Sequence, residues 1–471
     1  MIKNMVFDDI EFKVDDTGQL LQMTNRGEAK DVFIPSEFPS GECVRAIGTK
    51  FCQGQYLTVT VDDKISEIKE WAFEGAAVET VVWPSSCKTI PLCCFEDSAV
   101  KIVTNIDDVE VVERQAFSNG HIREINWPSK CKKIPDSCFY GLSSIRGIEN
   151  VEEIGCSAFR CCLFKTFVWP QKCKAIPRFC FSGTPLISIT GIENVESVGL
   201  GAFRETNFNE FVWPSKCKAI PASCFSESRL GSILNIDNVE KVGNNAFEKS
   251  SIKSIKWPSK CDRIGQFCFY QSGLEEIANI ENVTYIEPFA FAGTALAKID
   301  WPLGCKRIPY QCFYKSSLKT ITGIDEVEVV EEEAFAEACI EEFAWPKGCT
   351  KIPKGCFKNS KLKTISGIED VKMVEIRAFA HCSIESIIWP SKCTVIPSYC
   401  FIGSKLRIIS NIDNVRTINT KAFSRSKIEE LNLSGFASLE LKPHSLSGVS
   451  ESKVYLPYYM PTDLKDEIFA K

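Results

Sequence analysis

The sequence has few of the residues that catalytic and metal sites most often use. Its 471 residues include three histidines, His121, His381 and His444, which lie far apart in the chain. Zinc sites usually need closely spaced pairs of cysteine or histidine, and no Cys-x-x-Cys occurs. Phosphate loops, Gly-x-Ser-x-Gly, His-Glu-x-x-His and dinucleotide fingerprints are also missing. We therefore expect no metal, no cofactor and no enzymatic activity.

Charge of one sign and long apolar runs are lacking as well. The 61 acidic and 55 basic residues form no basic stripe, which argues against a nucleic-acid partner. No run approaches the roughly 18 apolar residues of a membrane span. The opening MIKNMVFDDIEFKV lacks the apolar segment of a signal peptide. These features predict no membrane span and a cytoplasmic protein.

The sequence does contain an internal repeat, and Trp-Pro pairs are its marker. Their spacing is 44 residues, with one of 42, at Trp83, Trp127, Trp169, Trp213, Trp257, Trp301, Trp345 and Trp389. A second motif ending in Ala-Phe alternates with the Trp-Pro motifs, at Phe73, Phe117, Phe159, Phe203, Phe247, Phe291, Phe335, Phe379 and Phe423. Each 44-residue unit therefore consists of two similar half-units of about 20 to 24 residues.

Each half-unit has the pattern of one solenoid coil. The patterns Ile122-x-x-Ile125-x-Trp127 and Leu142-x-x-Ile145 predict a short strand whose alternate residues face inward. The stretch that follows, through Cys-Phe or Ala-Phe, is too short for a full helix. We expect it to form one turn of helix or a 3-10 segment.

The corner after the strand differs between the two half-units. One type carries Trp-Pro, where proline holds the tryptophan extended. The other type, the companion coil, carries glycine or asparagine, which predicts a positive φ. We expect each tryptophan to stack over the small residue of its neighbour. The small residues are Asn105, Gly147, Gly191, Asn235, Asn279, Gly323, Gly367 and Asn411.

Sixteen of the 24 cysteines occupy two positions of the Trp-Pro coil, four and eleven residues after the tryptophan. Coils stack about 4.8 Å apart, so equivalent cysteines two coils apart lie about 9 to 10 Å from each other, too far for a disulfide. A bridge within one coil, such as Cys131 to Cys138, stays open. The simplest interpretation is a small buried apolar residue, and the extra group Cys156, Cys161 and Cys162 is interpreted as packed or partly exposed thiols.

The repeat resembles the BspA-like, or Treponema-type, leucine-rich repeats, as in VEEIGCSAFRCCLFKTFVWP and VKMVEIRAFAHCSIESIIWP. The resemblance implies an α/β, β-rich solenoid. In this right-handed superhelix, short parallel strands line the concave face, and short helical or 3-10 turns the convex face. We predict a strand-rich N-terminal cap over 1–32, about nineteen coils over 33–450 and a C-terminal cap over 451–471. The resemblance also implies a surface antigen that acts in adhesion, which would place the chain at the cell surface; the compartment stays open.

A solenoid binds through its row of aligned strands, so we expect a protein or other macromolecular ligand on the concave face. An apolar line flanked by hydroxyls would suit a protein surface, although strands also favour Val, Ile and Thr for their own stability. A self-associating intracellular scaffold is the alternative, an enzyme with an unrecognised pocket near either terminus is a distant one, and the oligomeric state is left open. The candidate residues are Val82, Asn126, Val168, Val212, Lys256, Asp300, Ala344, Ile388, Ser144, Ser188, Thr190, Thr320, Thr322 and Thr364.

Overall fold

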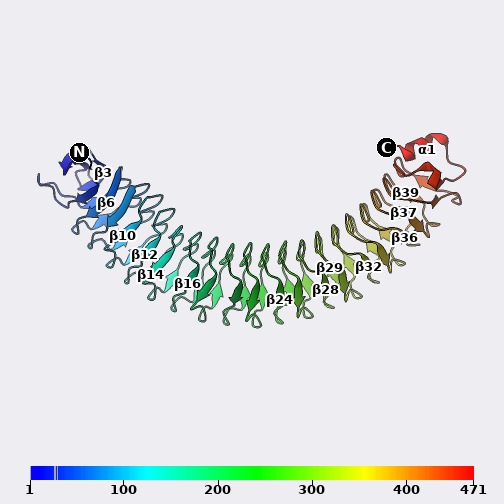
Figure 1. Cartoon of the computed structure of the whole chain (residues 1–471), viewed down its shortest axis with the longest axis horizontal. Coiled ribbons are helices and arrows are strands. Elements are labelled where there is room, and N and C mark those ends of the chain that lie inside the picture. The colour runs from blue at the N-terminus through cyan, green and yellow to red at the C-terminus, as the bar shows by residue number, and fades with distance from the viewer. Residues whose placement is uncertain (1, 26–27, 29, 53, 471) are drawn as a thin grey trace. The chain divides into compact units, whose positions relative to one another are not determined.

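The computed structural model describes residues 2–25, 28, 30–52 and 54–470. The chain divides into two compact units, Met1–Leu230 and Gly231–Lys471, and each is described by itself. Both units are built from coils that each contribute two short strands, so that two rows of strands run along each unit (Figure 1). The prediction of a solenoid of short parallel strands is confirmed.

The first unit begins with antiparallel strands, unlike the coils that follow. Strands β1 (Lys3–Phe7), β2 (Ile10–Val14) and β3 (Gln19–Asn25) pair antiparallel in that order. The start of β3 then pairs in parallel with β5 (Ala46–Ile47). The ladders that follow in the first unit, such as β5 with β7, β4 with β6 and β6 with β8, are parallel.

The first-row strands precede the corner of each coil and are mostly three residues long. In the first unit they are β4 (Asp31–Ile34), β6 (Gln55–Val61), β8 (Ala77–Val82), β10 (Ile102–Thr104), β12 (Glu124–Asn126), β14 (Ser144–Arg146), β16 (Thr166–Val168), β18 (Ser188–Thr190) and β20 (Glu210–Val212). In the second unit they are β22 (Ser232–Leu234), β24 (Ser254–Lys256), β26 (Glu276–Ala278), β28 (Lys298–Asp300), β30 (Thr320–Thr322), β32 (Glu342–Ala344), β34 (Thr364–Ser366), β36 (Ser386–Ile388), β38 (Ile408–Ser410), β40 (Leu431–Asn432) and β42 (Val454–Tyr455).

The second-row strands follow the corner and are two residues long. In the first unit they are β5, β7 (Glu67–Ile68), β9 (Thr89–Ile90), β11 (Val111–Val112), β13 (Lys133–Ile134), β15 (Glu153–Ile154), β17 (Ala175–Ile176), β19 (Ser197–Val198) and β21 (Ala219–Ile220). In the second unit they are β23 (Lys241–Val242), β25 (Arg263–Ile264), β27 (Tyr285–Ile286), β29 (Arg307–Ile308), β31 (Val329–Val330), β33 (Lys351–Ile352), β35 (Met373–Val374), β37 (Val395–Ile396), β39 (Thr417–Ile418) and β41 (Glu440–Leu441).

Strand pairing places equivalent residues of successive coils beside each other. Phe167 of β16 pairs with Ile189 of β18, 22 residues later, and both belong to the inward position of the strand. The coil that contains Trp127 is two residues shorter, since Ile125 pairs with Ile145. This shorter coil accounts for the single 42-residue spacing in the sequence.

Aromatic side chains stack through the interior of both units. In the first unit the ring of Phe117 lies 5.5 Å from that of Phe95, with the two rings nearly parallel. In the second unit Phe313 lies 5.7 Å from Phe291 in the same arrangement. All eight Trp-Pro tryptophans are at most 3% exposed. The pattern of inward residues in the sequence therefore predicts the core.

The prediction of helical turns on the outer side of the coil is wrong. Residues two before and two after the stacked phenylalanine have positive φ, as at Ser137 and Gly141 around Phe139 and at Phe289 and Gly293 around Phe291. Because a left-handed residue interrupts an α-helix, these segments form successive turns. Among the described residues, helices occur only at η1 (Glu451–Lys453) and α1 (Thr462–Phe469).

The backbone N–H groups of these turns donate hydrogen bonds in two ways, some to the next coil and others within the same turn. The N–H of Phe95 donates to the carbonyl of Ala116 in the next coil at 2.8 Å, whereas the N–H of Ser98 donates back to the carbonyl of Phe95 at 3.3 Å. Hydrogen bonds between coils thus replace those that a helix would have made within itself.

The prediction of a positive φ at the small corner residues is confirmed. The reason that the residue is small differs from the expected stacking of the neighbouring tryptophan. All eight small residues have positive φ. At Gly191, an added Cβ would lie 2.6 Å from the backbone carbonyl oxygen of Trp169. At Asn105, the side-chain Nδ2 instead donates to the carbonyl of Trp83 at 2.7 Å. The neighbour's backbone carbonyl, and not its indole ring, therefore dictates the small residue.

The C-terminal residues depart from the repeat. Residues 451–469 contain η1, β42 and α1, and Ile468 of α1 is buried. The predicted boundaries of the two caps and the array stay predictions.

Candidate functional site

The first face, formed by the outward side chains of the first-row strands, contains all the candidate binding residues. Twelve of these residues are exposed, while Val82 and Ser144 are partly exposed. Pairing brings candidates of neighbouring coils together: Val168 lies beside Thr190, and Asp300 lies beside Thr322, whose hydroxyl donates to the Asp300 carboxylate. Their role in binding stays a prediction.

Three candidates are large apolar side chains with unusually high exposure. Val168 is 70% exposed, Val212 is 55% exposed and Ile388 is 68% exposed. In the first unit, β16 and β18 present Thr166, Ser188 and Thr190 around Val168. Arg146 occupies the position equivalent to Val168 in the preceding coil. Lys256 and Asp300 give the second unit a different, charged first face.

Two hollows among the described residues lie on the first face. In the first unit, Asn126, Ser144 and Arg146 line a hollow of about 300 Å³. In the second unit, Thr320, Thr364 and Ala344 line a hollow of about 620 Å³. The small side chain of Ala344 stands where the other Trp-Pro strands carry a larger residue. The hydroxyls of Thr320 and Thr364 on the flanking strands therefore border open space.

Several outward residues of the first face were missing from the candidates. The position three before each tryptophan is outward too, and there β12 has Glu124, β28 has Lys298 and β32 has Glu342, all exposed. The companion strands also present Ile102 and Ile408, which are 51% and 55% exposed, where small polar residues were expected. The period of two along each strand was sufficient to find them.

The second face, formed by the outward side chains of the second-row strands, was not anticipated. In the second unit the guanidinium groups of Arg263 and Arg307 both lie against the ring of Tyr285. Their Cζ atoms are 4.9 and 5.1 Å from the ring centroid, respectively. Arg307 also donates to the Tyr285 hydroxyl at 2.6 Å and forms an ion pair with Glu331 at 3.0 Å. The arginines are therefore held in fixed positions.

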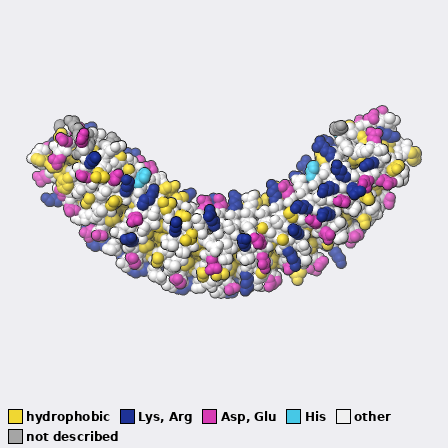
Figure 2. Space-filling view, in the orientation of Figure 1, with side chains coloured by type: hydrophobic (Ala, Val, Ile, Leu, Met, Phe, Trp, Pro, Cys, Tyr) yellow, Lys and Arg dark blue, Asp and Glu magenta, His cyan; other side chains and the backbone are white. Residues whose placement is uncertain are grey.

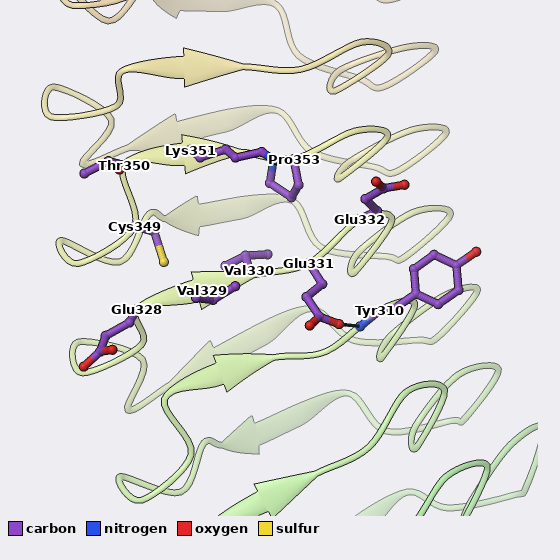
Figure 3. A pocket seen from close by; sticks show the side chains of 10 residues that line it. All are labelled: Tyr310, Glu328, Val329, Val330, Glu331, Glu332, Cys349, Thr350, Lys351 and Pro353. Atoms are coloured by element: carbon purple, nitrogen blue, oxygen red, sulfur yellow. Dashed lines mark hydrogen bonds between the residues drawn. The ribbon is translucent and has the colours of Figure 1, made fainter.

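A hollow of about 410 Å³ lies beside this group (Figure 3). Val329 of β31 and Lys351 of β33 line it from the strands, and Tyr310 and Glu332 line it from the turns. The Glu331 carboxylate accepts a hydrogen bond from the backbone N–H of Tyr310 at 2.7 Å. Because Glu331 is used in this contact and in its ion pair with Arg307, it is part of the scaffold of the turn.

All 24 cysteines are free thiols, including the Cys131 and Cys138 pair of one coil. Burial raises the pKa of the Cys173 thiol to about 11 and that of Cys305 to about 12. Burial holds the pKa of Cys180 well above its ordinary value. Thiolates are the nucleophilic and metal-binding form, so these buried thiols are suited to packing.

Charges of both signs are interspersed on the face of the molecule drawn in Figure 2. Within the described ranges 2–25, 28, 30–52 and 54–470, no three His, Cys, Asp or Glu side chains form a potential metal site. No helix in the described part of the chain is long and apolar enough to cross a bilayer.

The model of the BspA type leucine rich repeat region (6 copies) matches this chain over residues 37–146, 110–231, 152–275, 219–339 and 328–445. No curated protein matches it.

Solved structures are similar at low identity. A leucine-rich repeat protein from Bacteroides ovatus is 19% identical, with 88% of this chain and 93% of that chain covered and a TM-score of 0.43. A leucine rich cell surface protein from Faecalibacterium prausnitzii is 16% identical, with 79% of this chain and 94% of that chain covered and a TM-score of 0.37. A leucine rich repeat protein from T. pallidum is 18% identical, with 43% of this chain and 88% of that chain covered and a TM-score of 0.28.

Proposed function

The chain belongs to the BspA-type leucine-rich repeat family, and on this premise we propose that it is a binding module that holds a protein ligand on its first face. The observation that carries the proposal is the exposure of Val168 and Val212, 70% and 55%, on strands of the first unit. Covering a valine fully contributes about 1.5 to 3 kcal/mol. A ligand that covers both residues would gain this energy without rearranging the strands.

The surroundings of the two valines combine hydroxyls with single charges of both signs, Arg146 in the coil before Val168 and Glu210 on the strand of Val212. This mixture favours a protein over a polymer with charge of one sign. Thr166, Ser188 and Thr190 supply hydroxyls next to Val168. Apolar side chains surrounded by hydrogen-bonding groups are typical of protein interfaces. The hollow around Asn126 and Ser144 lies on the same face of the same unit and offers room for a side chain of the ligand.

The test is selection of ligands from a phage-displayed random peptide library, followed by binding measurements on variants. Val168→Glu and Val212→Glu each place a charge on the first face and are expected to weaken binding of the selected peptides at least about tenfold, because the buried charge would be unpaired. Circular dichroism should stay unchanged, since both side chains are exposed.

Ala175→Glu and Ala219→Glu are the matched controls. These exposed alanines lie in β17 and β21, on the second-row strands of the same two coils. The controls are expected to bind the peptides as the wild-type chain does. Peptides that bind equally well to the Val168→Glu and Val212→Glu variants would contradict the first face as the binding surface.

The finer proposal is that this binding serves adhesion at a cell surface, as the family resemblance implies. Beads coated with the chain should then adhere to immobilised matrix protein or to cells, and the Val168→Glu variant should not. The scaffold alternative predicts light scattering that grows with protein concentration; a strict monomer at high concentration would exclude it.

A further inference from the structure

The repeat is interrupted near the end of the second unit, and the interruption opens a hollow. Ile396 pairs with Ile418, 22 residues later, whereas Ile418 pairs with Leu441, 23 residues later. The extra residue falls in a corner where Leu433 takes the place of tryptophan and the segment Ser434–Ser438 replaces the usual Trp-Pro corner. This segment and the corners of the two preceding coils border a hollow of about 720 Å³, named here the C-terminal hollow.

The lining of the C-terminal hollow is rich in hydrogen-bonding groups that are already held in place. Asn414 donates through Nδ2 to the carbonyl of Ser391 at 3.2 Å, which leaves its Oδ1 as an acceptor. Asn432 accepts through Oδ1 from both the N–H and the hydroxyl of Ser434, at 3.1 and 2.8 Å. Its Nδ2 then remains as a donor.

Three further side chains complete the chemistry of the lining. Arg416 and Asp413 both line the hollow, and among the residues that the structure describes neither forms an ion pair. They supply a charged donor and a charged acceptor to the same lining. Phe436 from the segment Ser434–Ser438 adds one apolar ring.

We propose that the C-terminal hollow binds a neutral saccharide. Sugar hydroxyls both donate and accept, and the planar groups of Asp413, Asn414, Arg416 and Asn432 meet both needs. The volume lies within the about 300 to 1,000 Å³ of small-molecule sites. A free anion fits less well, because the lining contains the carboxylate of Asp413 as well as Arg416 and because the ammonium of Lys392, which also lines the hollow, is held by Asp370 at 2.6 Å.

The experiment is saturation-transfer NMR on the full chain with maltose, cellobiose, lactose and chitobiose, and with galacturonic acid and inorganic phosphate as anionic probes. At least one neutral disaccharide is expected to give a signal. Phe436→Ala and Arg416→Gln should each reduce it about fivefold, the size of one lost contact of about 1 kcal/mol. The matched control is Lys372→Gln, which changes the equivalent corner position 44 residues earlier and should leave the signal unchanged.

Three results would overturn the proposal: no signal from any of the four disaccharides, equal signals from the Phe436→Ala and Arg416→Gln variants, or signals from the anionic probes only. Circular dichroism of each variant checks that it is folded. The Val168→Glu variant is expected to bind the disaccharide normally, so that failure of this proposal and failure of the first-face proposal are separate outcomes.

Discussion

The indole Nε1 of Trp169 donates a hydrogen bond to the backbone carbonyl of Cys173 at 3.0 Å, four residues further along the chain. The same bond recurs in all eight Trp-Pro coils, at 2.8 to 3.2 Å. The Cys173 thiol in turn donates to the carbonyl of Val151 in the preceding coil at 3.5 Å. The spacing Trp-Pro-x-x-Cys is therefore a corner in which the indole ring closes the turn. In five of the eight coils the thiol also joins the corner to the preceding coil, and in the other three it donates to a carbonyl two residues ahead in its own coil.

Replacing the ring without its donor should destabilise the corner. In Trp169→Phe the buried carbonyl of Cys173 loses its hydrogen-bond partner, and we expect a loss of about 1 to 3 kcal/mol in the free energy of unfolding. Urea denaturation of the variant and the wild-type chain measures this difference in the free energy of unfolding. Ile176→Val in the same coil is the control for lost packing alone, at about 0.5 to 1.5 kcal/mol. A Trp169→Phe variant as stable as the wild-type chain would contradict the role of this bond.

The companion corner should distinguish alanine from asparagine at one position. Gly191 has a φ of 78°, and an added Cβ would lie 2.6 Å from the carbonyl oxygen of Trp169. For Gly191→Ala we expect a loss of about 1 to 2 kcal/mol from the left-handed conformation, in addition to the close contact.

Gly191→Asn should lose less than the alanine variant, by about 1 kcal/mol. Asn279 and Asn411 occupy the equivalent corner and donate to a tryptophan carbonyl at 2.6 and 2.7 Å. Thermal denaturation of the two variants gives the comparison directly. An alanine variant as stable as the asparagine variant would show that the side-chain amide does not compensate for the contact.

The sequence was sufficient to predict the coil and its core because both depend on periodicity. Ile125, Trp127 and Phe139 recur at fixed intervals, and a period that repeats along the chain identifies the inward positions. The turn conformation could not be predicted in this way. Residues such as Ser137 and Phe289 have positive φ without being glycine or asparagine, and their N–H groups donate to carbonyls of the next coil, a contact that the sequence pattern does not reveal.

The candidate site was predictable only in part for a related reason. Alternation along a strand shows that Val168 faces outward, but it carries no information on depth. The hollow around Ala344 depends on the side chains of the two flanking strands, and the C-terminal hollow depends on one inserted residue that shifts the pairing of Leu441. Both features became visible once neighbouring coils were placed beside each other.

The buried thiols should make the fold sensitive to alkaline pH. Burial raises the pKa of Cys173 to about 11 and holds that of Cys180 well above its ordinary value, whereas an unfolded thiol has a pKa of about 8.5. Folded thiols stay protonated while unfolded ones ionise. Their stabilising contribution is therefore complete below about pH 8.5 and is lost as the pH rises towards about 11.

The loss should amount to about 1.4 kcal/mol per pH unit for each such thiol. Urea midpoints at pH 7.5, 9 and 10 measure it. Cys173→Val and Cys180→Ala insert the residues that the companion coils carry at these positions, as in Val151 and Ala158, so both variants should fold. Each variant should reduce the slope of the free energy of unfolding against pH by the equivalent of about one proton. An unchanged slope in the double variant would contradict the assignment to these thiols.

Thiol labelling of the native, reduced protein should follow burial coil by coil. One cysteine, Cys43, is exposed, three are of intermediate burial (Cys156, Cys161 and Cys339), and the other 20 are buried. At pH 7 a thiol with a pKa of about 11 is ionised in about one molecule in ten thousand. An aromatic disulfide reagent should therefore label one thiol rapidly, three slowly and the rest only when the chain unfolds.

The Cys43→Ser variant is expected to lack the rapid phase and to keep the slow one. More than four thiols labelled in the native state would contradict the packing of the two cysteine positions of the Trp-Pro coil. The same reagent on denatured, unreduced protein separates the remaining alternative for Cys131 and Cys138. Twenty-four reactive thiols are expected if every cysteine is free. A deficit of two thiols for each bridge would mean that coils form internal disulfides. In that case the sensitivity of the fold to alkaline pH should diminish in the same proportion.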